Sequence, residues 1–239
     1  MIDLHCHILP FVDDGAQDIA ESLALATAAV ADGITHAVLT PHLHPGRWEN
    51  GLASLLPRFN AFRAMLASSA LPLTLSLGAE VRLLPESLTM LAQDDVPMLG
   101  AWEGERVMLL EFPHEQVPVG ALNAIKWLRA RGVRPLLAHP ERNRDLMREP
   151  GRIDAFVEAG CLLQVTAGSV VGAFGAPAQA LAKLLLDAGR VTVVASDAHN
   201  IAHRPPLMAQ ARAALAAGWG DELALRLTRD NPQTIVGGR

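Results

Sequence analysis

The sequence repeats one pattern, in which a short apolar run ends in a histidine or a carboxylate. The chain opens with the run Met1–Leu4, which leads directly into His5-Cys6-His7. Five more apolar runs end in the same way, at His42, Glu80, Glu111, His139 and Asp197-Ala198-His199. In a parallel α/β barrel the strands share one direction, so their C-terminal ends meet at one mouth. The pattern therefore predicts a parallel α/β fold that brings these side chains together.

Strand-like and helix-like segments alternate along the whole chain, as in parallel α/β proteins. Seven apolar runs are predicted to be strands: the first leads into His5, and the others cover 34–40, 73–78, 107–110, 134–138, 161–165 and 191–195. Helices are predicted near 19–30, 51–69, 85–93, 119–131, 151–159, 176–188, 206–217 and 221–228. We therefore expect a distorted seven-stranded (β/α)7 TIM-like barrel that forms one domain over residues 1–239.

The residues at the strand ends have the chemistry of metal ligands. His5 and His7 are two residues apart on a strand, so both side chains point to the same face. Two histidines buried together would be costly without a partner. Each of the other residues could belong to a buried ion pair instead, but their shared placement favours ligands for zinc, manganese or iron.

Asp13-Asp14-Gly15 is a weaker candidate, because Asp-Gly is first of all a turn signal. A turn explains Gly15 but does not require two adjacent acids, so Asp14 is favoured as a further ligand. Four carboxylates and five imidazoles could then serve three divalent ions if one carboxylate bridges. The nine predicted ligands are His5, His7, Asp14, His42, Glu80, Glu111, His139, Asp197 and His199.

Two arginines indicate what such a centre would act on. Arg142 follows His139 closely, and Arg204 follows His199. An arginine offers a planar fork of donors that fits phosphate oxygens, which favours an anionic substrate over simple surface pairing of each arginine. Arg47 is a weaker candidate for substrate binding, with Trp48 as an aromatic wall.

Composition narrows the class of protein. The net charge is −5, and the basic residues form no dense block, which argues against nucleic acid or an anionic membrane surface as the main partner. Cys6 and Cys161 are the only cysteines, so a reducing cytoplasm is expected. Neither cysteine is followed by an arginine six positions on, as a cysteine-dependent phosphatase requires. The charge-free stretch 159–182 contains glycines and Pro177, so we expect a strand, a loop and a helix there and no stable membrane insertion.

The local motifs resemble the polymerase-and-histidinol-phosphatase (PHP) superfamily, and within it the bacterial protein-tyrosine phosphatases of capsule and exopolysaccharide biosynthesis. The match covers nearly the whole chain in order. It consists of His5-Cys6-His7-Ile8-Leu9-Pro10, Asp13-Asp14-Gly15, Thr40-Pro41-His42, Gly78-Ala79-Glu80, Glu111-Phe112-Pro113, His139-Pro140-Glu141-Arg142, Ser196-Asp197-Ala198-His199-Asn200, Arg204-Pro205-Pro206 and Asp230-Asn231-Pro232.

This resemblance implies a PHP fold with a trinuclear centre on the nine ligands, and Arg142 and Arg204 holding phosphate. Manganese is the metal that the resemblance favours, with iron or zinc as alternatives. The implied substrate is a phosphotyrosine protein, above all the tail of a bacterial tyrosine autokinase, hydrolysed by metal-activated hydroxide. Two alternatives stay open: another PHP activity, such as a histidinol-phosphate or nucleotide phosphatase, and a non-catalytic metal-stabilised binding domain.

Overall fold

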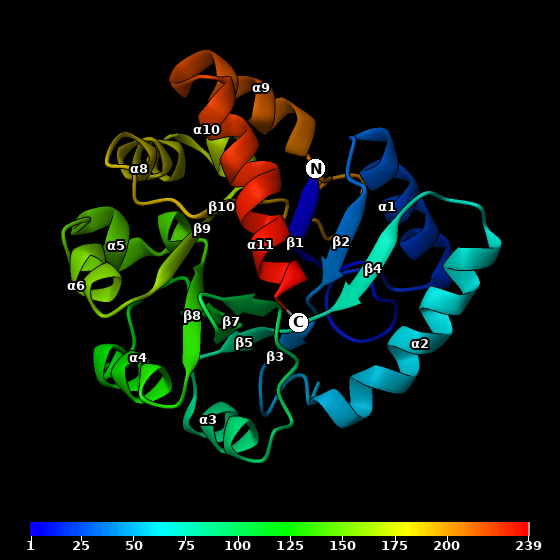
Figure 1. The fold of residues 1–239 in the computed structure, drawn as a ribbon, viewed down its shortest axis with the longest axis horizontal. Helices are drawn as coiled ribbons and strands as arrows, with labels where there is room; N and C mark the ends of the chain where they lie inside the picture. Colours follow the sequence, from blue (N-terminus) through cyan, green and yellow to red (C-terminus); the bar gives the residue numbers. More distant parts are fainter. Residues whose placement is uncertain (239) are drawn as a thin grey trace.

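A computed structural model describes residues 1–238 as a mixed α/β domain in which helices surround parallel strands (Figure 1). All seven predicted strands form: β1 (Ile2–Cys6), β2 (His36–Leu39), β4 (Thr74–Leu77), β7 (Glu105–Glu111), β8 (Val133–Ala138), β9 (Leu162–Thr166) and β10 (Val193–Ala195). The predicted number of strands is nevertheless too low, because the chain also forms β3 (His42–Leu43), β5 (Glu80–Arg82) and β6 (Gly100–Trp102).

Two of the additional strands continue earlier ones after a short break. Leu39 of β2 lies opposite Leu77 of β4, and His42 of β3 lies opposite Glu80 of β5, so the register is the same on both sides of the break. Pro41 lies in one break and has no N–H to donate to a ladder. The other break contains Gly78, where an added Cβ would lie 2.7 Å from the Leu99 side chain.

The strands form two hydrogen-bonded sheets, so the strand ladders among residues 1–238 do not close into a barrel. One sheet has the order β1-β2-β4, and the other has the order β10-β9-β8-β7-β5-β3, with β6 antiparallel to β7. Hydrogen bonds beyond the end of β10 link the two sheets. Asp197 N–H donates to the His5 carbonyl at 2.7 Å, and His7 N–H donates to the Ala198 carbonyl at 2.8 Å.

Eight helices match the predicted ones: α1 (Ile19–Ala31), α2 (Leu52–Ser68), α3 (Pro85–Ala92), α4 (Ala121–Arg129), α6 (Arg152–Glu158), α8 (Ala176–Asp187), α9 (Met208–Trp219) and α10 (Asp221–Leu225). The sequence did not predict the 3-10 turn η1 (Pro140–Arg142), α5 (Arg144–Arg148), α7 (Ala167–Val170), the π-helical turn η2 (Arg226–Asp230) or α11 (Asn231–Gly237). Asp18 caps α1, since its carboxylate accepts from Glu21 N–H at 2.8 Å. Within residues 1–238, every helix is too short or too polar to cross a bilayer.

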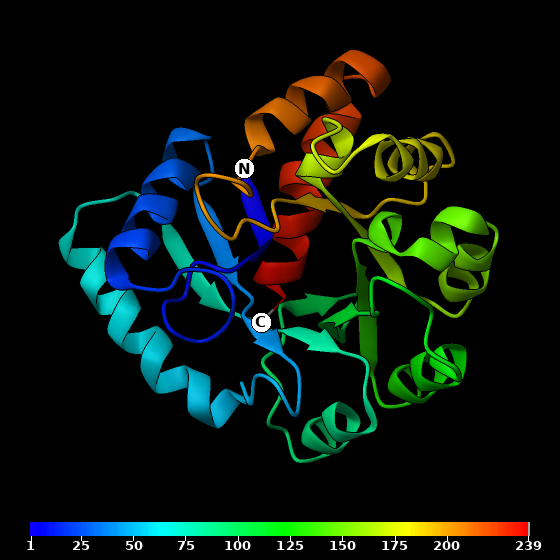
Figure 2. The ribbon, with the colours of Figure 1, turned by 180° about the vertical axis from the view of Figure 1, so that it is seen from behind.

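The C-terminal helix α11 packs across one end of the strands, in front of them in Figure 1 and behind them in Figure 2. Its residues Ile235 and Val236 belong to an apolar cluster that also contains Val107 and Leu109 of β7. Side chains two residues apart on a strand share a face, so Glu111 continues the stripe that Val107 and Leu109 begin. The apolar cluster therefore fills one end of the strands, and polar residues occupy the other.

Candidate metal centre and active site

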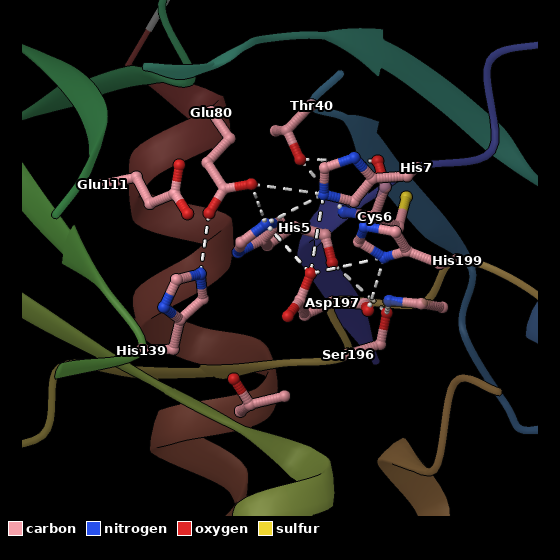
Figure 3. Close-up of polar contacts among 12 residues, drawn as sticks. His5, Cys6, His7, Thr40, Glu80, Glu111, His139, Ser196, Asp197 and His199 are labelled. Atoms are coloured by element: carbon pink, nitrogen blue, oxygen red, sulfur yellow. Dashed lines mark hydrogen bonds and ion pairs between the residues drawn. The ribbon is translucent and has the colours of Figure 1, made fainter. Parts of the chain in front are cut away.

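Four buried side chains point their ligand atoms at one place (Figure 3). The His5 Nε2 atom lies 3.2 Å from His7 Nε2, 3.2 Å from Glu80 Oε2 and 3.3 Å from Asp197 Oδ1. The His7 Nε2 atom lies 3.4 Å from the same Glu80 oxygen and 3.5 Å from the same Asp197 oxygen. Ligands about 2.0–2.2 Å from a tetrahedral ion lie roughly 3.3–3.6 Å apart, so these spacings fit one divalent ion.

Hydrogen bonds on the far side of both rings fix which nitrogen faces this point. His5 Nδ1 lies 2.9 Å from Gln164 Oε1, and His7 Nδ1 lies 2.7 Å from Asp13 Oδ2. Both partners accept, so each Nδ1 carries a proton and, in the neutral rings, each Nε2 presents a lone pair. Two lone pairs and two carboxylate oxygens then face one another, an arrangement that a cation between them stabilises.

Two further groups of ligand atoms adjoin the first. One contains His7, Asp14, His42 and His199, and the other contains His42, Glu80 and Glu111. His42 Nε2 lies 3.3 Å from Asp14 Oδ1, whereas His42 Nδ1 lies 2.9 Å from Glu80 Oε2. The Asp14 side chain is 48% exposed, so this group opens to solvent. Eight of the nine predicted ligands therefore lie in three adjoining groups.

His139 lies beside these groups. Its Nε2 atom is 2.7 Å from Glu80 Oε1, the carboxylate oxygen that faces away from His5 and His7. The His139 backbone has φ of 33°, and Asp197 has φ of 53°. Left-handed backbone is uncommon for residues other than glycine and is concentrated at functional sites. These two turns at the strand ends therefore direct both side chains toward the centre at the cost of local strain.

Several ligand atoms of the centre have no hydrogen-bond partner among residues 1–238. They are Glu80 Oε2, Glu111 Oε2, Asp197 Oδ1 and His199 Nε2. Burial raises the pKa of Glu111, and the neighbouring Glu80 carboxylate raises it further. Burial also lowers the pKa of His139 to about 4, so this ring is neutral and able to ligate at neutral pH. Buried oxygens that accept no hydrogen bond and a neutral imidazole fit divalent cations, which would supply additional positive charge.

A cavity of about 200 Å³ opens above the centre and contains all four predicted substrate-binding side chains. Arg142 and Arg204 both form ion pairs with Asp197 Oδ2. Trp48 stacks on the His42 ring at a centroid distance of 4.9 Å, and the Arg47 Cζ atom lies 3.9 Å from the Trp48 ring centroid. The cavity is therefore cationic at its walls and lies over the carboxylates of the centre.

Sequence reasoning missed four residues at this site. Asp13 and Gln164 orient the two N-terminal histidines, and Arg82 pairs with Glu111 at 3.0 Å between Nε and Oε2. Phe174 packs against the two arginines that pair with Asp197. The sequence does carry a signal for two of these residues. Arg82 is two residues after Glu80 on a strand and so shares its face, and Asp13 is adjacent to the predicted ligand Asp14. Neither Gln164 nor Phe174 belongs to a local pattern that would mark it.

The sequence profile of the family described as "Capsular polysaccharide synthesis, CpsB/CapC" matches residues 1–237. The chain belongs to the CpsB/CapC family. This assignment agrees with the resemblance that the sequence motifs indicate, since the profile spans every motif quoted for it.

Two bacterial tyrosine-protein phosphatases are similar to this chain over nearly its full length. Tyrosine-protein phosphatase YwqE of Bacillus subtilis is 36% identical, covering 96% of this chain and 89% of YwqE. Tyrosine-protein phosphatase CpsB of Streptococcus pneumoniae is 31% identical, covering 99% of this chain and 98% of CpsB. A crystal structure also matches this chain, with a TM-score of 0.92 and 35% identity. It belongs to work that describes YwqE and CpsB as unique metal-dependent tyrosine phosphatases. The match covers 100% of this chain and 95% of the matched chain.

Proposed function

We propose that this CpsB/CapC family member is a metal-dependent protein-tyrosine phosphatase. The observation that carries the proposal is the convergence of imidazole and carboxylate ligand atoms, several of them buried without a hydrogen bond, below a cavity whose walls present arginines. Carboxylates and imidazoles bind divalent ions, and arginine forks bind phosphate oxygens. The activity named for the relatives YwqE and CpsB supports the same reaction.

Three divalent ions are proposed to occupy the three groups of ligand atoms. Manganese is the proposed metal because the resemblance to the PHP phosphatases implies it, with iron or zinc as alternatives. The mixed nitrogen and oxygen donors of each group are compatible with all three. His139 would complete the group of His42, Glu80 and Glu111 through its position beside Glu80. When bound, the ions would neutralise phosphoryl charge and lower the pKa of a water that attacks phosphorus.

The chain's own residues would position the substrate for this attack. Arg142 and Arg204 would hold the phosphoryl oxygens, and Arg47 and Trp48 would flank the entering tyrosine ring. Gln164 and Asp13 would keep the Nε2 lone pairs of their histidine partners directed at the centre. Phosphoryl transfer depends mostly on positioning and charge neutralisation, and this arrangement serves both.

The proposal extends to the architecture and the setting. Residues 1–239 would act as one PHP-type phosphoesterase domain. Its strands would form a distorted seven-stranded TIM-like barrel, in which β2 and β3 count as one interrupted strand and β4 and β5 count as the next. The common register across each break supports this description. Both cysteines are free and buried, which supports a cytoplasmic protein. The proposed substrate is the phosphotyrosine tail of a bacterial tyrosine autokinase.

The test is hydrolysis of a phosphotyrosine peptide beside histidinol phosphate, with Mn²⁺ and then with a chelator. We expect metal-dependent release of phosphate from the peptide that thiol alkylation does not change. Burial raises the pKa of the Cys161 thiol to about 12, and Cys6 is fully buried, so neither thiol is reactive at neutral pH. Activity restricted to histidinol phosphate would assign another PHP reaction. No turnover with any metal would contradict the proposal.

A further inference from the structure

Phe174 lies in the charge-free stretch 159–182, between α7 and α8, and contacts the two arginines of the cavity. The Arg142 Cζ atom is 4.3 Å from the centroid of the Phe174 ring, and the Arg204 Cζ atom is 6.0 Å from it. Both distances fall within the range of cation–π attraction, which extends to about 6 Å. One ring therefore contacts two guanidinium groups that come from separate segments of the chain.

The same two guanidinium groups share a second partner. Each pairs with Asp197 Oδ2, so the arginines are held between a carboxylate and an aromatic ring. Asp197 also presents its other oxygen, Oδ1, to His5 and His7. The ring contributes what the carboxylate cannot, because it attracts the cations without offering an oxygen that competes with phosphate.

The position of the Phe174 ring is itself fixed by close packing. A Cβ atom at Gly168 would lie 2.6 Å from Phe174 Cε2, so the ring packs directly on the bare backbone of α7. Ala173 N–H donates to the Gly168 carbonyl at 2.8 Å, which ties the loop that carries Phe174 to the same residue. Gly168 is therefore required by space, and the ring has little room to move toward α7.

We propose that Phe174 is a positioning residue for phosphate recognition, which holds the guanidinium groups of Arg142 and Arg204 together at the wall of the cavity. This inference rests on the proposed phosphatase function. Removing the aromatic face would leave Asp197 as the remaining shared partner of both arginines, although Phe174 is not among the residues that line the cavity.

The test compares Phe174→Leu, which keeps an apolar side chain but removes the aromatic face, with Phe174→Tyr, which keeps the face. Gly168→Ala is a second perturbation, because its methyl group would displace the ring without changing Phe174. The measurements are KM and kcat for a phosphotyrosine peptide, the inhibition constant of inorganic phosphate, bound metal per chain, and the thermal midpoint. Val119→Ala is the matched control, since this residue is fully exposed on the loop before α4.

We expect Phe174→Leu and Gly168→Ala to raise both KM and the phosphate inhibition constant by roughly threefold to tenfold, since cation–π contacts are of modest strength. The value of kcat should fall less than these constants rise, and Phe174→Tyr should stay near wild type. Equal constants for Phe174→Leu and wild type would overturn the inference. Equal losses in Phe174→Leu and Phe174→Tyr, or losses that follow metal content or the thermal midpoint, would assign a purely structural role. A wild-type protein without phosphatase activity would instead overturn the proposed function.

Discussion

The two ends of the strands carry opposite chemistry on the same inward-facing stripes. At one end Val107 and Leu109 share an apolar cluster with Ile235 and Val236 of α11. Two residues after Leu109, Glu111 stands at the other end, 1% exposed and paired through Oε2 with Arg82. The period of two is unchanged along the stripe, and only the residue type changes. One strand thus serves folding with its first half and chemistry with its second half.

The difference separates stability from function. Burying the apolar end stabilises the fold at about 25 cal/mol for each Å² removed from water. The polar end buries several carboxylates and imidazoles, which costs free energy unless a cation compensates. Substitutions at the two ends should therefore fail in different ways.

The largest effect is expected at the polar end. Asp197→Ala removes an oxygen of the central ligand group and the shared partner of both arginines. We expect kcat to fall by about a thousandfold or more, because metal-assisted charge stabilisation is worth several kcal/mol and each 1.36 kcal/mol is tenfold in rate. The chain should stay folded by circular dichroism, while bound metal per chain decreases. Asp221→Ala, at the start of α10, is the matched control. An active Asp197→Ala protein would contradict the metal assignment.

At the apolar end, Leu109→Ala should instead destabilise the fold. Leu109 is fully buried in the cluster that α11 completes, so its truncation should lower the free energy of unfolding by about 2–5 kcal/mol. Urea denaturation of the apo protein measures this change. The kcat of the folded fraction should stay within about twofold of wild type. Leu56→Ala serves as a control, because that side chain is 44% exposed on α2 and should cost far less.

A smaller effect is expected at Gln164, whose side chain orients a histidine of the metal centre. Gln164→Met keeps the volume of the side chain but removes the oxygen that accepts from His5 Nδ1. Loss of such an orienting partner typically reduces metal affinity or activity by about 10–100-fold. Isothermal titration calorimetry with the metal would measure the affinity. Gln93→Met is the control, because Gln93 is exposed. Unchanged affinity would mean that Gln164 does not set the orientation of the His5 ring.

The parts of the site that could be predicted follow local rules. His5 and His7 were placed on one face by their spacing, and their Nε2 atoms do meet at 3.2 Å. Gln164 could not be predicted, because an amide on a buried strand belongs to no motif and acts across 159 positions of sequence. The role of Phe174 could not be predicted either, because its two arginine partners come from turns that only the fold brings together.

The fold was predictable to the same extent. Each apolar run became a strand, because hydrophobic pattern and length determine where strands form. The breaks in the β2–β3 and β4–β5 paths depend on how Pro41 and Gly78 meet neighbouring strands, which pattern alone does not specify. The closing helix α11 was missed because 231–237 is short, and its apolar residues are explained only by the cluster they cover.

Anomalous diffraction from crystals of the protein grown with Mn²⁺ would show whether the metal binds where the ligand atoms converge. We expect a peak between His5 Nε2, His7 Nε2, Glu80 Oε2 and Asp197 Oδ1, with further peaks in the groups that contain Asp14 and Glu111. Manganese elsewhere on the surface, with the four central side chains paired only to one another, would contradict this expectation.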